Sequence, residues 1–208
     1  MKEIVLATKN LDKIKEMREV FKDMPLRVLT FHDFPCMEEI EESGNTLEEN
    51  ALIKAEAWAR FTNKWALSDD TGLEVEYLGG RPGVFSSRFA GIGATYEDNW
   101  RKLLKLMEGV VWEKRKAKFR CVVAIVSPQG EKLIVEGVTE GYITCEPRGS
   151  EGFGYDPVFY VPEKGKTFGE MSIEEKEEIS HRGKALRIAK EILNKKLEGK
   201  GNVKNERV

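Results

Sequence analysis

The sequence predicts an α/β protein built on a long, twisted, mixed sheet that is flanked by helices, in two lobes with a cleft between them. The short apolar run at 4–7 reads as a buried strand, and 27–29 reads as a second short strand after a helical pattern. Two long arms rich in valine and isoleucine, 117–126 and 132–144, predict a hairpin around the turn at 127–130. Strands and helices mix without strict βαβ alternation, which argues against a plain doubly wound order.

Size and composition exclude several classes of protein. The chain has 208 residues, 40% hydrophobic and 34% charged, which suits one large domain or two tightly joined lobes with a normal core. A formal net charge of −2 gives no support to a protein that coats nucleic acid. The longest purely apolar run, 121–126, is too short to cross a membrane, and the first residues read as a strand and not as a signal peptide.

Cysteine and histidine are both scarce. The three cysteines are scattered and have no metal-ligand spacing, which fits the reducing cytoplasm. With two histidines in the whole chain, zinc sites built from several histidines are excluded. Any catalysis must therefore depend on carboxylates, lysine, arginine and a hard metal ion.

The first strand leads through a polar turn into a helix. Asn10 is a good N-cap, and the backbone N–H groups at a helix start attract anions. Thr8, Lys9 and Lys13 gather at the same point. The pattern fits an anion site or an ordinary cap with two solvated lysines. The helix carries its predicted apolar face on Leu11, Ile14, Met17, Val20 and Phe21.

An acidic loop at 38–45 precedes the second helix. Its four glutamates are the pattern of a solvated surface, from which a metal site would recruit one residue and not all. The segment 46–49 is a capping box that opens the helix. Lys54 lies off the apolar stripe of this helix and could face a cleft.

The central motif is Ser68-Asp69-Asp70-Thr71-Gly72-Leu73, which follows a segment that reads as the end of a strand. If the backbone is extended, Asp69 and Asp70 point to opposite faces, so one of them faces a given ligand. Adjacent carboxylates are costly to bury unless a cation or hydrogen bonds compensate. The motif fits a solvated turn or a carboxylate metal site at a strand end.

The later segments add glycine-rich loops and two more helix starts. Three glycines and a proline in 78–83 predict a loop that bends sharply or lets something approach its backbone. Thr95 caps a third helix, in which we interpret Tyr96 as part of an apolar core face. A capping box at 172–175 precedes Lys176, and the segment 180–184 opens the last helix.

The segment 149–157 places two aromatic residues among three glycines. Rings on such a loop are poor core material and suit stacking on a flat ligand such as a nucleobase. The alternative is an aromatic turn that Asp156 and Pro157 hold in place.

Taken in order, these segments resemble the inosine/xanthosine triphosphate pyrophosphatases, which act on deaminated purine nucleotides. The resemblance runs from residue 1 to about residue 198. It rests on Thr8-Lys9-Asn10 with Lys13, the segment 41–46 with 49–51 and Lys54, 68–73, 80–83, Phe153-Gly154-Tyr155-Asp156-Pro157 and Ser180-His181-Arg182. Lys9 departs from the glycine that is usual in bacterial relatives, a change that most turn geometries accept.

The resemblance implies an elongated α/β fold in which residues 1–198 form one two-lobed domain with a cleft, and 199–208 a flexible tail. It implies hydrolysis of dITP, ITP, XTP and dXTP to the monophosphate and pyrophosphate, with Mg²⁺ as cofactor. The expected protein is a cytoplasmic homodimer with no nucleic-acid or membrane partner. A nucleotide sensor without catalysis, or a pyrophosphatase of this scaffold acting on modified pyrimidine nucleotides, are the alternatives.

Residue roles follow from the same resemblance. Glu41 and Asp70 are the expected Mg²⁺ ligands, Asp70 is the expected base, and Asp69 supports it. The expected substrate-binding residues are Thr8, Lys9, Asn10, Lys13, Lys54, Thr71, Phe153, Gly154, Tyr155, Asp156, Lys176, His181 and Arg182. Arg182 and Lys176 would donate to the 6-keto oxygen that adenine lacks, and Phe153 would stack on the purine. No residue is identified as a reader of the purine 2-position.

Overall fold

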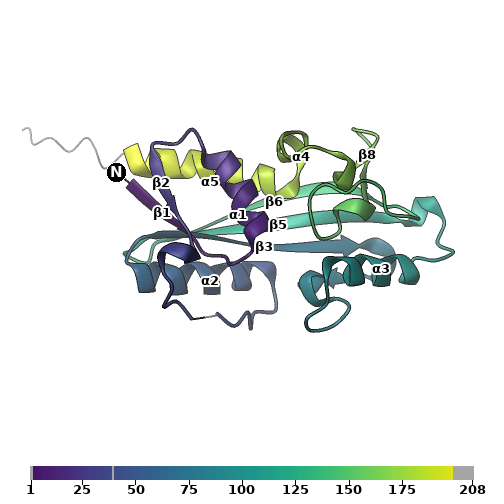
Figure 1. Cartoon of the computed structure of the whole chain (residues 1–208), viewed down its shortest axis with the longest axis horizontal. Helices are drawn as coiled ribbons and strands as arrows, with labels where there is room; N and C mark the ends of the chain where they lie inside the picture. The colour runs from purple at the N-terminus through teal and green to yellow at the C-terminus, as the bar shows by residue number, and fades with distance from the viewer. Residues whose placement is uncertain (1, 39, 199–208) are drawn as a thin grey trace, which may run out of the picture.

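The computed structural model describes residues 2–38 and 40–198, so the predicted tail at 199–208 lies outside the described residues. An eight-stranded mixed sheet in the order β2-β1-β3-β5-β6-β7-β8, with β4 beside β3, runs along the molecule (Figure 1). The strands are β1 (Lys2–Leu6), β2 (Leu26–Leu29), β3 (Trp65–Val75), β4 (Pro82–Gly83), β5 (Lys116–Val126), β6 (Lys132–Ile143), β7 (Phe159–Val161) and β8 (Lys166–Thr167). β1 is parallel to β2 and β3, and the other pairings are antiparallel.

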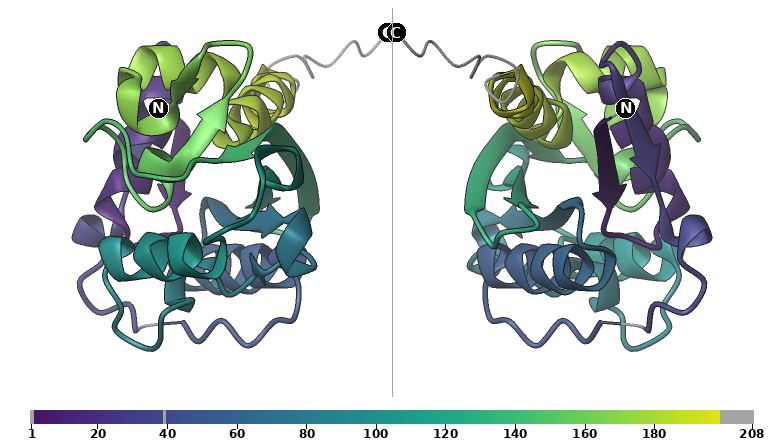
Figure 2. Two further views of the ribbon diagram at one scale, coloured as in Figure 1. Left: turned by 90° about the vertical axis from the view of Figure 1, so that its right-hand side faces the viewer. Right: turned by 90° about the vertical axis from the view of Figure 1, so that its left-hand side faces the viewer.

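Helices lie on both sides of this sheet. They are α1 (Leu11–Phe21), α2 (Leu47–Thr62), α3 (Tyr96–Leu106), α4 (Ile173–Ile179) and α5 (His181–Glu198). In Figures 1 and 2, α1, α4 and α5 lie on one side of the long strands and α2 and α3 on the other. Within the described residues, no helix is long and apolar enough to cross a membrane.

Separate apolar cores explain the two lobes. In the first lobe, one core joins α1 and α5 to the sheet, and a second joins α2 to its other face. The third core lies at the opposite end, where α3, β7 and the neighbouring loops pack on the far halves of β3 and β5. Because β3 and β5 take part in both lobes, one continuous sheet sets their relative position. The predicted α/β class, mixed sheet and hairpin, here formed by β5 and β6, are confirmed.

β3 corrects the expectation that a strand ends before Ser68. The strand is continuous from Trp65 to Val75 and pairs with β5 from Ala66↔Val126 to Val75↔Ala117. The solvated-turn interpretation of the motif is therefore wrong, because its backbone is committed to the ladder. Gly72 has a separate reason to lack a side chain, since a Cβ there would lie 2.8 Å from the carbonyl oxygen of Gly83 in β4. The backbone that lies close to Gly72 is therefore that of β4.

Two expectations about helix faces also need correction. Leu11, expected on the buried face of α1, is 63% exposed, because it is the first helical residue and projects beyond the core. Tyr96, expected in the core of the third helix, is 41% exposed. Its hydroxyl bonds with polar groups of the first lobe, which a core position could not offer.

Candidate active site

A cavity of about 310 Å³ lies between the lobes, and every substrate-binding residue expected from the sequence lines it. Its walls come from the turn before α1, the acidic loop, α2, β3, the start of α3, the aromatic loop and the α4–α5 corner. The expected residues in the lining are Thr8, Lys9, Asn10, Lys13, Lys54, Thr71, Phe153, Gly154, Tyr155, Asp156, Lys176, His181 and Arg182, together with Asp70. Asp69 and Glu41 do not line it.

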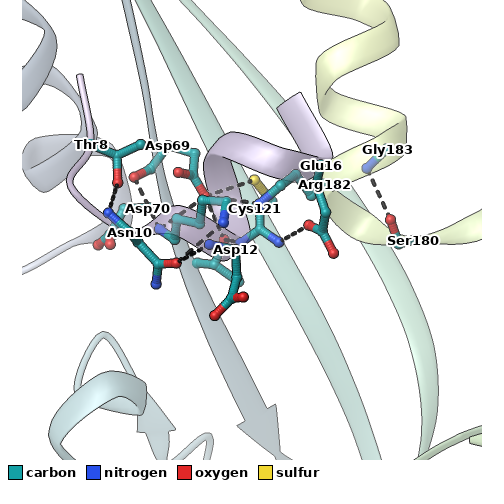
Figure 3. A network of polar contacts seen from close by, with 12 residues as sticks. Thr8, Asn10, Asp12, Glu16, Asp69, Asp70, Cys121, Ser180, Arg182 and Gly183 are labelled. Carbon is teal, nitrogen blue, oxygen red and sulfur yellow. Dashed lines mark hydrogen bonds and ion pairs between the residues drawn. The ribbon is translucent and has the colours of Figure 1, made fainter. Parts of the chain in front are cut away.

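The central carboxylates point to opposite faces of β3, as strand alternation predicts. Asp69 is fully buried and forms ion pairs with Lys13 at 3.0 Å and Arg182 at 3.2 Å on the α1 and α5 side (Figure 3). Asp70 is 8% exposed and accepts a hydrogen bond from Asn50 of α2 at 3.3 Å. Only Asp70 therefore faces the cavity.

The two carboxylates have opposite electrostatic environments. Burial alone would raise the pKa of Asp69, but the charges of Lys13, Arg182 and Lys54 outweigh it and hold this pKa well below its ordinary value. Burial also raises the pKa of Asp70, and there Lys54 and Lys13 offset only part of the effect. Asp69 is thus a permanent anion that orders its cations, whereas Asp70 is a more basic carboxylate suited to accept a proton.

One end of the cavity is rich in donors for an anion. Asn10 caps α1 through its Oδ1, which accepts from the backbone N–H groups of Asp12 and Lys13 at 3.0 and 3.2 Å. The Nζ of Lys54 donates to the carbonyl oxygen of Asp69 and to Glu42, each at 2.8 Å, and lies 3.5 Å from Asp70. A helix start with nearby ammonium groups is a favourable environment for phosphate groups.

The acidic loop places Glu38 and Glu42 in the cavity wall, and not the expected Glu41. Glu41 is exposed and lies outside the cavity wall, whereas its neighbour Glu42 lines the cavity and is held there by the ion pair with Lys54. Among residues 2–38 and 40–198, no group of three or more His, Cys, Asp or Glu residues could by itself hold a metal ion. Glu42 and Asp70 therefore offer two carboxylates, a set that suits a hard cation that also binds phosphate oxygens.

The other end of the cavity holds Phe153 and two buried cations. Phe153 is half-buried, and the Nζ of Lys176 lies 4.9 Å from its ring centroid. Lys176 donates to Asp156 at 2.6 Å and to Glu16 of α1 at 2.8 Å. Arg182 pairs with the same Glu16, with Asp69 and, at 3.1 Å, with the hydroxyl of Thr71. Glu16 therefore fixes two donors at once, although nothing in the sequence analysis singled it out.

Three of the residues expected at the base end of the cavity, Tyr155, Asp156 and His181, are buried. Tyr155 is buried and donates its hydroxyl to the carbonyl oxygen of Ser86 at 2.9 Å. Asp156 is buried and accepts from the backbone N–H of Phe153 at 2.8 Å. Burial and then the charges of Arg182 and Lys176 hold the pKa of His181 well below its ordinary value, so this ring is neutral. It stacks on Phe119 with ring centroids 4.4 Å apart, and its Nδ1 has no hydrogen-bond partner among the described residues.

Cys121 of β5 is a second residue that the sequence analysis did not assign to the site. Its Sγ lies 3.8 Å from the Oδ2 of Asp69, within the network drawn in Figure 3. Burial, helped by the charge of Asp69, raises the pKa of this thiol to about 12. Cys121 is therefore a protonated, weak donor to Asp69. The cysteine spacing gave no sign of this contact, because it joins side chains on two strands that are far apart in the sequence.

The chain is similar to known proteins over nearly its whole length. Residues 4–192 match the Ham1 family. The chain is 54% identical over 200 residues to the dITP/XTP pyrophosphatase of Caldanaerobacter subterraneus subsp. tengcongensis, covering 95% of this chain and 99% of that protein. It is 48% identical to the enzyme of the same name from Bacillus anthracis, covering 92% and 96% of the two chains.

Solved structures give the same result for the fold. A HAM1 protein from Coxiella burnetii superposes with a TM-score of 0.85 at 44% identity, covering 94% of this chain and all of that one. The Ham1 protein of Staphylococcus aureus has a TM-score of 0.83 at 39% identity, with 94% and 100% covered. The resemblance found in the motifs thus extends over nearly the whole chain. The protein belongs to the Ham1 family.

Proposed function

We propose that the protein hydrolyses non-standard purine nucleoside triphosphates, the inosine and xanthosine forms with ribose or deoxyribose, to the monophosphate and pyrophosphate. One observation carries the proposal: the raised-pKa carboxylate of Asp70 faces a cavity that has cationic donors at one end and an aromatic ring with two fixed cations at the other. In a nucleoside triphosphate, the anionic phosphates suit the cationic end and the flat base suits the aromatic end. The relatives named dITP/XTP pyrophosphatase support the substrate class.

In the proposed reaction, Asp70 accepts a proton from a water molecule as the water oxygen bonds to the α-phosphorus. The bond between this phosphorus and the bridging oxygen to the β-phosphorus breaks, and pyrophosphate leaves with that oxygen. Asn10, Lys13 and Lys54 hold the phosphate oxygens and their charge. Phe153 stacks on the purine, while Lys176 and Arg182 donate to its 6-keto oxygen.

We propose Mg²⁺ as the cofactor, with Asp70 and Glu42 as its protein ligands. Both carboxylates line the cavity and lie beside the same ammonium group, and Mg²⁺ often binds one or two carboxylates and keeps water and phosphate oxygens as its other ligands. Glu41, the ligand that the resemblance implies, is exposed and does not line the cavity. When bound, Mg²⁺ would neutralise phosphate charge and make the phosphorus easier to attack.

The assembly and location belong to the same proposal. We expect a homodimer, the usual form in the family that the motifs resemble, and sedimentation of the purified protein measures it directly. We expect the activity in the cytoplasm, where scattered free cysteines are common.

The experiment is release of pyrophosphate from ITP, XTP, GTP and ATP, with and without Mg²⁺. We expect turnover of ITP and XTP and little of the other two. Asp70→Asn should lower kcat by roughly 10²–10⁴-fold, the usual contribution of a general base. Asp23→Asn, which alters an exposed aspartate that does not line the cavity, is the matched control.

Each alternative has its own outcome. Equal turnover of all four nucleotides would keep the chemistry and refute base reading by Lys176 and Arg182. Tight nucleotide binding without hydrolysis would indicate a sensor. Turnover of modified pyrimidine nucleotides alone would indicate the other substrate class on the same scaffold.

A further inference from the structure

Tyr96 lines the cavity and contacts residues that line both of its ends. It is the first residue of α3 in the second lobe, and it lines the same cavity as Asn10 and Phe153. Its hydroxyl accepts a hydrogen bond from the Nδ2 of Asn10 at 3.0 Å and donates to the Oδ2 of Asp12 at 3.3 Å. Its ring lies 5.7 Å from the ring of Phe153, centroid to centroid, at a tilt of 44°. Tyr96 therefore contacts the anion end and the aromatic end at once.

The two hydrogen bonds join the lobes. Asn10 and Asp12 belong to the first lobe, at the start of α1, and α3 belongs to the second. Within the described part of the chain, α3 and the start of α1 share no other hydrogen bond or ion pair. Burial, with the charge of Asp12, raises the pKa of Tyr96, so the hydroxyl stays protonated and can donate.

Tyr96 adds a second restraint on the Asn10 amide, beside its cap of α1. The Oδ1 of Asn10 is occupied by the backbone N–H groups at the start of α1. Its donors are therefore the two N–H bonds of Nδ2, and one of them is directed to Tyr96. The second N–H remains for a ligand. Loss of the phenolic oxygen would remove this restraint and leave the cap of α1 alone to hold the amide.

A nucleotide that uses both ends of the cavity must pass its sugar between them. With the phosphates at Asn10 and the base against Phe153, the sugar would lie beside Tyr96, because Tyr96 lines the cavity and contacts both of these residues. We propose that Tyr96 is a substrate-positioning residue, which orients Asn10 and closes the sugar segment of the cavity by linking α3 to α1. This inference rests on the proposed function for the identity of the ligand. It assigns Tyr96 no part in bond breaking.

The test replaces Tyr96 by phenylalanine, which removes the oxygen and keeps the ring. We expect Tyr96→Phe to raise KM for both ITP and dITP about fivefold, the effect of one ordinary hydrogen bond, and to change kcat less than twofold. Tyr77→Phe is the matched control, because Tyr77 is 52% exposed and lies outside the cavity. An unchanged KM in Tyr96→Phe, or a loss of kcat with KM unchanged, would overturn the proposal.

A double-mutant cycle separates positioning from simple packing. Asn10→Ser keeps a side-chain oxygen to cap α1 and removes the amide donor. If Tyr96 acts through Asn10, the Tyr96→Phe change should have less than a twofold effect on KM in the Asn10→Ser background. The full fivefold effect there would contradict the coupling.

A binding measurement keeps this inference distinct from the proposed reaction. In the Asp70→Asn background, the dissociation constant for ITP can be measured by titration calorimetry without turnover. We expect Tyr96→Phe to weaken binding about fivefold. If no triphosphate is hydrolysed by the unaltered protein, the proposed reaction fails, yet this binding ratio still supports or refutes the role of Tyr96.

Discussion

Glu16 offers a sharp test of how the base end of the cavity is built, because one carboxylate holds two buried cations. Breaking a buried ion pair by removing one partner costs about 3–5 kcal/mol of stability. In Glu16→Gln, however, Lys176 keeps Asp156 at 2.6 Å and Arg182 keeps Asp69 at 3.2 Å, so neither cation is left unpaired. We therefore expect a smaller loss of about 2 kcal/mol, which lowers the melting temperature by roughly 4–8 °C in a chain of this size.

The matched control is Glu19→Gln on the same helix. Glu19 pairs with the exposed Lys22, so its replacement should change stability by less than about 0.5 kcal/mol. Urea unfolding of the parent and both variants gives the comparison at one temperature. Equal stabilities of Glu16→Gln and Glu19→Gln would refute the reasoning, because they would mean that Glu16 contributes no more than a surface charge.

The pH dependence gives an independent check with a defined sign. Burial would raise the pKa of Glu16, but Arg182 and Lys176 outweigh it, so the pKa lies below its ordinary value of 4.5. A carboxyl group with a lowered pKa stabilises the fold above its unfolded value, and that contribution is lost as pH falls through the folded value. The difference in stability between the parent and Glu16→Gln should therefore shrink as pH falls below about 4.5.

Two further predictions concern the other parts of the site. Glu42→Gln removes a negative charge that raises the pKa of Asp70, so the acid limb of the kcat/KM profile should move to lower pH; an unmoved limb would exclude Asp70 as the group that titrates. Gly137→Ala would put a Cβ 2.1 Å from the carbonyl oxygen of His181 and 2.6 Å from the backbone nitrogen of Ala185. We expect it to displace the start of α5, to cost about 1–3 kcal/mol in urea unfolding and to raise KM, and a variant with parental KM would show that α5 adapts.

The sequence could predict those parts of the site that depend on local periodicity. Strand alternation alone separated Asp69 from Asp70, because successive side chains point to opposite faces whatever surrounds the strand. The N-cap at Asn10 was equally local, since it needs only a polar side chain before a helical pattern. The continuity of β3 was not predictable in this way, because Asp, Thr and Gly favour turns and only the pairing with β5 overrides that preference.

Residues that matter through distant partners were harder to find. Glu16 lies four positions before the buried Val20, so its carboxylate borders the buried face of α1. A charged group at such a position needs a partner of opposite charge. That partner, Lys176, lies 160 residues away, and no spacing in the sequence links the two. Tyr96 was assigned to the core because its helix is apolar on one face. Its polar contacts depend on how the lobes are placed, which the sequence pattern does not encode.

The fixed cations also limit what the base pocket can distinguish. Lys176 uses two of its three N–H donors on Glu16 and Asp156, and Arg182 uses donors on Glu16, Asp69 and Thr71, so few donors remain for a base. A 6-keto oxygen can accept from them, whereas the 6-amino group of adenine would face them as another donor, at a cost of about 1–3 kcal/mol for each unpaired group. Guanine carries the same 6-keto oxygen, so these cations cannot reject it. Selectivity against ATP and selectivity against GTP are therefore separate properties, and Glu16→Gln should weaken the first while leaving the second unchanged.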